Sequence, residues 1–192
     1  IPETAKAGDR FLSFARNTLV GNNRMSVDAA RKAASDRGYR TLTLSTVIEG
    51  EAREVGTVYA AVASEMVSSG NPIPPPACII GGGEPTVTIR GRGKGGRNQE
   101  MAVKVAERIA GLEQVVFLSG GTDGTDGPTD AAGGIVDGET YAAGVEKGLD
   151  IRAKLADNDS YHYLEKVGGL VITGPTGSNV MDIHILLVGK PG

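Results

Sequence analysis

Two kinds of apolar spacing alternate along this chain of 192 residues, and this alternation limits the fold more than any other feature of the sequence. Short apolar runs, typical of strands, occur at residues 41–44, 77–80, 115–119 and 183–188. Between them lie longer segments with apolar residues at helical spacing. We therefore predict an α/β fold, a three-layer sandwich with a largely parallel or mixed sheet.

Most of the other elements can be placed, but one segment leaves two alternatives open. The glycine-rich segment 81–85 separates the run 77–80 from a second run at 86–89. It predicts either a hairpin, which we favour, or a single strand broken by a bend. Further strands are expected at residues 17–20 and 170–173, and helices at residues 26–34, 51–67, 98–110, 139–147 and 159–167.

Charge and cysteine content narrow the class of protein. The net charge of -3 argues against a general nucleic-acid or membrane-surface partner, because both call for a basic face. Cys78 is the only cysteine and lies in an apolar run, so we expect a buried thiol in a reducing compartment, the cytoplasm. Residues 1–16 resemble a linker from a missing N-terminal half, and residues 17–192 are expected to form the α/β domain.

A basic, glycine-rich stretch occupies residues 91–100 (GRGKGGRNQE), directly after Arg90. Few Cβ atoms block its backbone, so peptide N–H groups and the cations of Arg92, Lys94 and Arg97 could approach one anion together. The alternative is a solvated turn. Its match to the G-x-G-x-x-G dinucleotide pattern is weak in a chain with 29 glycines.

An acidic stretch follows at residues 120–130 (GGTDGTDGPTD). Asp123, Asp126 and Asp130 offer the hard oxygen ligands that Mg2+ prefers, although Asp-Gly pairs also stabilise tight turns. The expected helix 98–110 joins the strand 115–119 by a short turn, so the two must run antiparallel. The helix start and the strand end should therefore meet at one sheet edge, where open α/β sheets bind ligands.

A third loop, residues 174–179 (GPTGSN), follows the strand expected at 170–173. Its hydroxyl and amide groups could bind a phosphate or a hydroxy acid, or the loop could be a plain turn. His184 lies in an apolar run and His162 in an expected helix beside Tyr161 and Tyr163, and both are expected to be structural.

Five segments carry a more specific signal than any glycine pattern: residues 49–56 (EGEAREVG), 82–88 (GGEPTVT), 95–100 (GGRNQE), 121–132 (GTDGTDGPTDAA) and 173–182 (TGPTGSNVMD). Together they resemble the C-terminal half of the class II glycerate kinase family, including its MOFRL domain, here about residues 77–190. The resemblance implies phosphoryl transfer from ATP to D-glycerate with Mg2+. We favour the 2-hydroxyl group as the acceptor, giving 2-phosphoglycerate, and the 3-phosphate stays open as the alternative product. The resemblance also implies an N-terminal half that supplies a catalytic lysine, so the chain alone is expected to be inactive.

By position, Arg97 resembles the catalytic arginine of that family, and Asp123 and Asp126 are the expected contacts to metal or substrate. The residues expected to bind substrate or nucleotide are Glu84, Lys94, Gly95, Gly96, Asn98, Thr122, Thr176 and Asn179. Two other functions stay open: a hydroxypyruvate reductase with a nicotinamide cofactor, and a non-catalytic module that binds nucleotides or anions.

Overall fold

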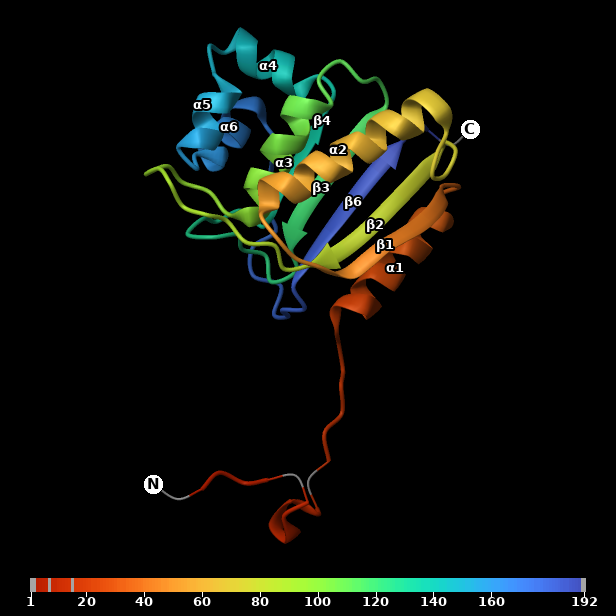
Figure 1. The fold of residues 1–192 in the computed structure, drawn as a ribbon, viewed down its shortest axis with the longest axis vertical. Helices are drawn as coiled ribbons and strands as arrows, with labels where there is room; N and C mark the ends of the chain where they lie inside the picture. The colour runs from red at the N-terminus through yellow and green to blue at the C-terminus, as the bar shows by residue number, and fades with distance from the viewer. Residues whose placement is uncertain (1–2, 7, 15, 191–192) are drawn as a thin grey trace.

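A single six-stranded sheet forms the centre of the molecule (Figure 1). The computed structural model describes residues 3–6, 8–14 and 16–190. The strands are β1 (Arg40–Ile48), β2 (Ala77–Gly83), β3 (Val115–Gly121), β4 (Gly133–Asp137), β5 (Leu170–Val171) and β6 (Asp182–Val188). Their order across the sheet is β1-β2-β6-β3-β4-β5.

The sheet is mixed, with β1 and β2 as its parallel pair and antiparallel pairing between the other neighbours. The α/β class and the mixed sheet are therefore confirmed, while a largely parallel arrangement is not found. The reason is that β6, the last strand of the chain, inserts between β2 and β3 and is antiparallel to both.

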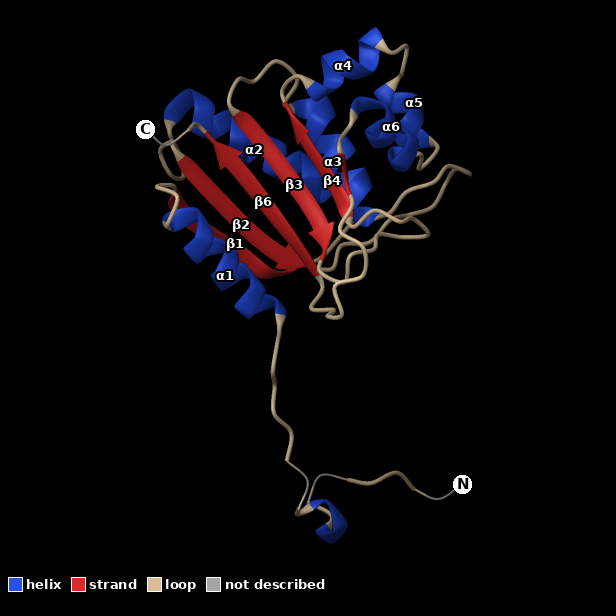
Figure 2. Ribbon diagram, turned by 180° about the vertical axis from the view of Figure 1, so that it is seen from behind, coloured by secondary structure: helices blue, strands red, loops and turns tan. Residues whose placement is uncertain are grey.

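Helices cover both faces of the sheet (Figures 1 and 2). They are α1 (Asn23–Ser35), α2 (Ala52–Ser69), α3 (Arg97–Arg108), α4 (Thr140–Glu146), α5 (Ile151–Ala156) and α6 (Ser160–Val167), preceded by a short 3-10 helix at Arg10–Leu12. The helices α2 and α3 lie on one face and α1 on the other, with α4 to α6 beside α3. None of the described helices is long and apolar enough to cross a membrane.

The larger hydrophobic core lies between the sheet and the helices α2 and α3. Tyr59 of α2 packs against Phe117 of β3 with ring centroids 5.0 Å apart. On the opposite face, Val27 of α1 packs against Cys78 and Ile80 of β2. Burial raises the pKa of the Cys78 thiol to about 11, which agrees with the expected inert, buried cysteine.

Two strands expected from the sequence are absent from the described residues. Residues 17–20 are exposed and pair with no strand. Residues 86–89 form no hairpin with β2; their one ladder contact is an isolated bridge between Thr86 and Glu51. A hairpin is excluded because β1 and β6 already occupy both sides of β2, whose glycine end continues to Gly83.

Three elements were missing from the prediction: the 3-10 helix Arg10–Leu12, β4 and α5. The strand β4 begins with Gly133 and Gly134, and glycine weakens any strand pattern, but both residues pair with β3 and β5. The helix α5 has only six residues, capped by the side chain of Asp150. The division into a linker at residues 1–16 and a domain from residue 17 onward stays a prediction, with residues 1–2, 7 and 15 outside the described part.

Candidate active site

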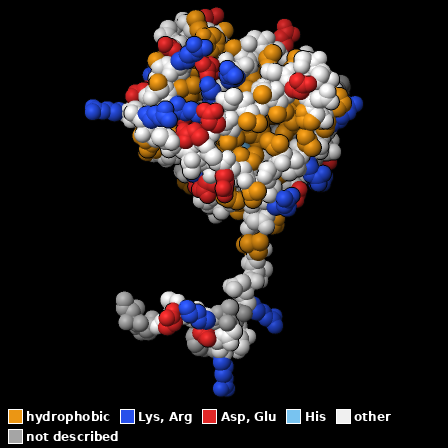
Figure 3. Space-filling view, in the orientation of Figure 1, with side chains coloured by type: hydrophobic (Ala, Val, Ile, Leu, Met, Phe, Trp, Pro, Cys, Tyr) orange, Lys and Arg blue, Asp and Glu red, His pale blue; other side chains and the backbone are white. Residues whose placement is uncertain are grey.

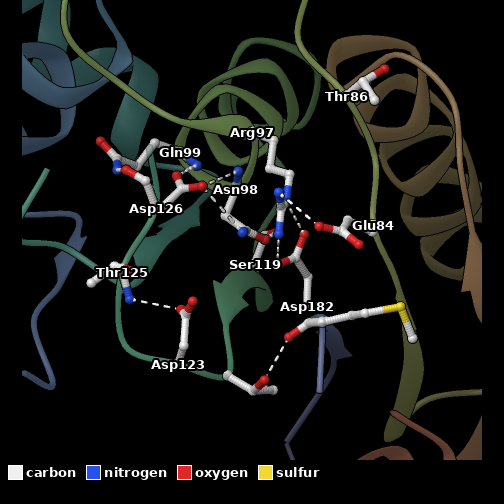
Figure 4. Close-up of polar contacts among 12 residues, drawn as sticks. Glu84, Thr86, Arg97, Asn98, Gln99, Ser119, Asp123, Thr125, Asp126 and Asp182 are labelled. Carbon is white, nitrogen blue, oxygen red and sulfur yellow. Dashed lines mark hydrogen bonds and ion pairs between the residues drawn. The ribbon is translucent and has the colours of Figure 1, made fainter. Parts of the chain in front are cut away.

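Three loops converge at the sheet edge where β2 and β3 end and β6 begins (Figures 1 and 4). The register places Gly83, Asp182 and Gly121 side by side in one row across these strands. The start of α3 meets the same edge, since the Oγ of Ser119 in β3 donates to the Oδ1 of Asn98 at 2.5 Å. The predicted meeting of the helix start and the strand end is therefore confirmed.

Arg97, the first residue of α3, points into this junction (Figure 4). Its Nε and Nη2 donate to the two carboxylate oxygens of Asp182 at 2.6 and 3.0 Å. Its Nη1 lies 3.3 Å from the Oε1 of Glu84, which follows β2. The hydrogen bond to Asp182 raises the pKa of the Arg97 guanidinium, so this side chain stays cationic.

Asp126 of the acidic loop caps the N-terminus of α3. Its two carboxylate oxygens accept from the backbone N–H groups of Asn98 and Gln99 at 3.1 and 2.9 Å, and only 3% of the residue is exposed. Burial raises the pKa of this carboxyl group to about 6, although the hydrogen bonds from α3 oppose the shift. The acidic loop and the basic segment are thus joined through a helix cap, a role that the sequence did not suggest.

The backbone of the basic loop is bound within the protein. All five N–H groups of residues 90–94 donate to acceptors in residues 157–159, at 2.7–3.0 Å. Glycine is required for this contact, because a Cβ at Gly91 would lie 2.3 Å from the backbone of Asp157. The expectation that these N–H groups bind an external anion is therefore wrong, and the weak dinucleotide pattern has a structural explanation.

Lys94 turns toward α6 instead of the sheet edge. Its Nζ lies 3.9 Å from the centroid of the Tyr161 ring, and the hydroxyl group of Tyr161 donates to Asp130 at 2.8 Å. On this flank of the molecule basic and acidic side chains lie side by side in the space-filling view (Figure 3).

A cleft of about 880 Å³ opens beside Arg97. Its walls come from the segments that follow β1 and β2, from the start of α3 and from the acidic loop. Five of the residues predicted from the sequence line it: Glu84, Gly95, Gly96, Arg97 and Asp126. Within the described part of the chain, the backbone N–H groups of Gly95, Gly96 and Arg97 donate to no protein acceptor, so this cleft wall can offer three donors to an anion.

The third loop binds the acidic loop and lies outside the cleft lining. The hydroxyl group of Thr176 donates to the backbone oxygen of Thr122 at 2.6 Å, and the Thr122 hydroxyl donates to the oxygen of Met181 at 2.7 Å. Asn179 donates to Asp123 at 3.3 Å. These predicted binding residues therefore hold two loops together next to the cleft.

Asp123 and Asp126 do not share a metal site in the described residues. Asp123 accepts from the N–H of Thr125 at 3.0 Å within its own turn, while both oxygens of Asp126 face the start of α3. No group of three His, Cys, Asp or Glu side chains that could hold a metal ion occurs in the part of the chain described. Asp123 nevertheless lies near the cationic site, since a Cβ on Gly121 would be 3.0 Å from Asp123 Oδ1 and 3.6 Å from Asp182 Oδ1.

Other predicted residues have structural surroundings. Asn98 is 1% exposed and bonds Ser119 and Asp126, so it supports the site from inside. His184 is buried, with its Nδ1 3.2 Å from the Tyr59 hydroxyl, and burial lowers its pKa to about 4.

Asp182 was not among the predicted site residues. The signal that could have found it is its position at the end of the segment 173–182, directly before an apolar strand, where a carboxylate at a sheet edge needs a partner.

A family model for the MOFRL family matches residues 77–182, more than half of the chain, and this range includes Glu84, Arg97, Asp182 and the acidic loop. This chain belongs to the MOFRL family. The glycerate 2-kinase of Pyrococcus horikoshii is 46% identical over 173 residues, which are 90% of this chain and 39% of that protein. A crystal structure of glycerate kinase from Thermotoga maritima superimposes with a TM-score of 0.88 at 46% identity, over 89% of this chain and 41% of that one.

A third relative, from Agrobacterium vitis, carries only a provisional name, hydroxypyruvate reductase, and is 40% identical over 97% of this chain and 42% of that protein. The chain spans about two fifths of the length of the relatives that it matches.

Proposed function

We propose that this chain is the C-terminal part of a glycerate kinase, which transfers the γ-phosphoryl group of ATP to a hydroxyl group of D-glycerate and gives 2-phosphoglycerate. One observation carries the proposal. Arg97 is held on the wall of a cleft, with one edge of its guanidinium group toward the cleft. Beside it are three backbone N–H groups that donate to no acceptor among the described residues. Such an arrangement of donors suits an oxyanion or phosphoryl group.

In this proposal Arg97 is the catalytic residue. Its fixed cation stabilises the charge that spreads over the equatorial oxygens of the phosphoryl group during transfer. The N–H groups of Gly95, Gly96 and Arg97 bind phosphate oxygens, and the positive end of the α3 dipole adds a smaller contribution of about 0.3–1 kcal/mol. Glu84 is 57% exposed and can turn away from Arg97 when an anion binds.

Mg2+ enters the proposal as part of the MgATP substrate. Mg2+ in kinases is commonly held by substrate phosphates with one or two protein carboxylates, and it neutralises charge on those phosphates. Asp123 is the predicted carboxylate whose position beside Asp182 fits such a contact, whereas the buried Asp126 fits its capping role.

The remaining parts of the enzyme are also proposals. Because the relatives are longer, we infer that a further domain completes the cleft, supplies the lysine implied by the family resemblance and makes the isolated chain inactive. We place the enzyme in the cytoplasm, in keeping with its single, buried thiol.

The reductase alternative is weaker in this structure. A nicotinamide dinucleotide would need the backbone N–H groups of the glycine pattern at residues 91–96, and those of Gly91 to Lys94 are bound to residues 157–159.

The deciding experiment is a phosphotransfer assay on the complete enzyme with D-glycerate and MgATP, in which the phosphorylated hydroxyl is identified by NMR. MgATP should also raise the melting temperature, while NADH should not. Reduction of hydroxypyruvate with NADH, without phosphotransfer, would replace the kinase proposal by the reductase.

A further inference from the structure

The carboxylate of Asp182 lies in an unusual position for a charged group. The residue is 0% exposed and sits between Gly83 of β2 and Gly121 of β3 in the sheet register. Neither neighbour carries a side chain, and the space that a Cβ would take is filled by the backbone of Ile48 beside Gly83 and of Thr125 beside Gly121. A buried carboxylate without a cation would be strongly unfavourable, so the row requires the partner that Arg97 supplies.

The contact with Asp182 fixes the orientation of Arg97 as well as its charge. Two parallel hydrogen bonds, from Nε and Nη2, hold the plane of the guanidinium group relative to the sheet. The remaining nitrogen, Nη1, is directed to the side of Glu84 and the cleft. A single point contact would leave the group able to rotate, whereas the paired contact leaves one edge presented to a ligand.

The backbone of residue 182 is held independently of its carboxylate. Its neighbours on both sides are paired strands, and its carbonyl oxygen accepts from the Nδ2 of Asn23 in α1 at 2.8 Å. The hydrogen bonds of the Asp182 side chain all go to Arg97 within the described residues. Among the described residues, the Asp182 carboxylate therefore orients Arg97 alone.

We propose that Asp182 is the positioning residue for Arg97, a role that rests on the proposed function of Arg97 in phosphoryl transfer. Asp182 binds no substrate itself. It holds the guanidinium group so that its Nη1 edge faces the transferred group before the reaction starts. Preorganised charge of this kind lowers the transition-state energy more than the energy of the bound substrate.

The test uses the complete enzyme and the variants Asp182→Asn, Arg97→Ala and the double variant. Asp182→Asn should lower kcat by about 100-fold, the loss associated with a small misplacement of a catalytic group, with a smaller change in KM. Added to Arg97→Ala, the same substitution should cause no further loss, because the group that it positions is already absent. An equal loss in both backgrounds would show a structural role and overturn the inference.

A direct measurement keeps the inference testable if activity assays fail. In enzyme labelled with 15N-arginine, the Nε–H signal of Arg97, assigned by its disappearance in Arg97→Lys, should exchange slowly with water. Asp182→Asn should remove this protection, and retained protection would refute the positioning contact whatever the enzyme catalyses. If Asp182→Asn does not fold, Arg97→Lys is informative by itself, since lysine cannot make the paired contact and should also lose turnover; full turnover would overturn the inference.

The outcomes separate the two proposals. Loss of phosphotransfer in Arg97→Ala with normal kcat in Asp182→Asn would reject the positioning role alone. A wild-type enzyme without phosphotransfer would reject the proposed function. Glu107→Gln is the matched charge control, because Glu107 also pairs with cations, Lys104 and Arg152, but lies near the C-terminal end of α3, outside the cleft lining.

Discussion

Two arginine–carboxylate pairs lie one helical turn apart on α3, and they serve different purposes. Arg53 of α2 donates twice to Glu100, at 3.0 and 2.6 Å, and also to the backbone oxygen of Leu155 at 3.3 Å. The second oxygen of Glu100 accepts from Asn158 at 2.8 Å. The guanidinium group of Arg53 and both carboxylate oxygens of Glu100 are therefore hydrogen-bonded within the protein. The pair joins α2, α3 and the segment at the end of α5.

The pair formed by Arg97 and Asp182 is equally buried on its acidic side but open on its basic side. Arg97 is 33% exposed, and its third nitrogen has the exposed Glu84 as its neighbour. The comparison teaches that burial of an ion pair does not by itself mark a functional site. What marks the site is the arginine edge that the protein leaves accessible in the cleft.

The largest expected difference between the two pairs concerns turnover. In the complete enzyme, Arg97→Ala should lower kcat by about a thousandfold or more, the lower range for an arginine that stabilises phosphoryl transfer. Arg53→Ala should keep kcat within a fewfold of wild type at temperatures where both variants are folded, because Arg53 does not line the cleft. Steady-state kinetics on both variants decide the matter. A comparable loss of kcat in both would remove the distinction between the two arginines.

The pair of Arg53 and Glu100 should contribute more to the stability of the fold than a more exposed pair does. Removing one partner of a buried ion pair costs about 3–5 kcal/mol, so Glu100→Ala should lower the free energy of unfolding by roughly 3 kcal/mol. Glu107→Ala, which loses the pairs with Lys104 and the exposed Arg152, should cost less, about 0.2–1 kcal/mol for each pair. Urea unfolding measures both values. Equal losses would mean that the burial of Glu100 contributes little.

The sequence predicted elements that depend on local contacts, and it failed where contacts between distant residues decide the structure. The helices around residues 26–34, 51–67 and 98–110 could be predicted because the spacing of their apolar residues is a local signal. The placement of β6 between β2 and β3 could not, since it depends on pairing between residues more than 60 positions apart. That insertion also removed the expected hairpin at residues 86–89.

The site shows the same contrast. Arg97 and the neighbouring loops could be predicted from residue type and chain direction, and five predicted residues line the cleft. The partner of Arg97 and the capping role of Asp126 could not, because both contacts join distant segments. The side-chain roles of Asp123, Thr176 and Asn179 in substrate or metal binding stay predictions.

Asp126 is a third buried carboxylate, but its hydrogen-bond donors are neutral amides, whereas Asp182 and Glu100 each pair with an arginine. With a folded-state pKa of about 6, raised from an ordinary value near 3.8, it favours the folded state most at low pH, and this contribution is lost as the pH rises from about 4 to about 6. The unfolding free energy of wild type minus that of Asp126→Asn should therefore fall over this window by on the order of 2–3 kcal/mol. Urea titrations at pH 4, 5, 6 and 7 test it, and a constant difference would show that the N–H donors of α3 fully compensate the burial.

Asp123 is a more exposed carboxylate than Asp182 and Asp126, and its substitution is expected to have the smallest effect of those considered. Its carboxylate accepts from Thr125 and Asn179 and lies beside the row that holds Asp182, and under the proposed function it is the carboxylate predicted to contact the Mg2+ of MgATP. Asp123→Asn keeps the size and the turn-forming capacity of the side chain but removes its charge. The Mg2+ concentration for half-maximal phosphotransfer should rise severalfold at saturating ATP, with the melting temperature unchanged. An unaltered Mg2+ titration would assign Asp123 to the turn, and Arg97 would then act without a protein carboxylate from this loop on the metal.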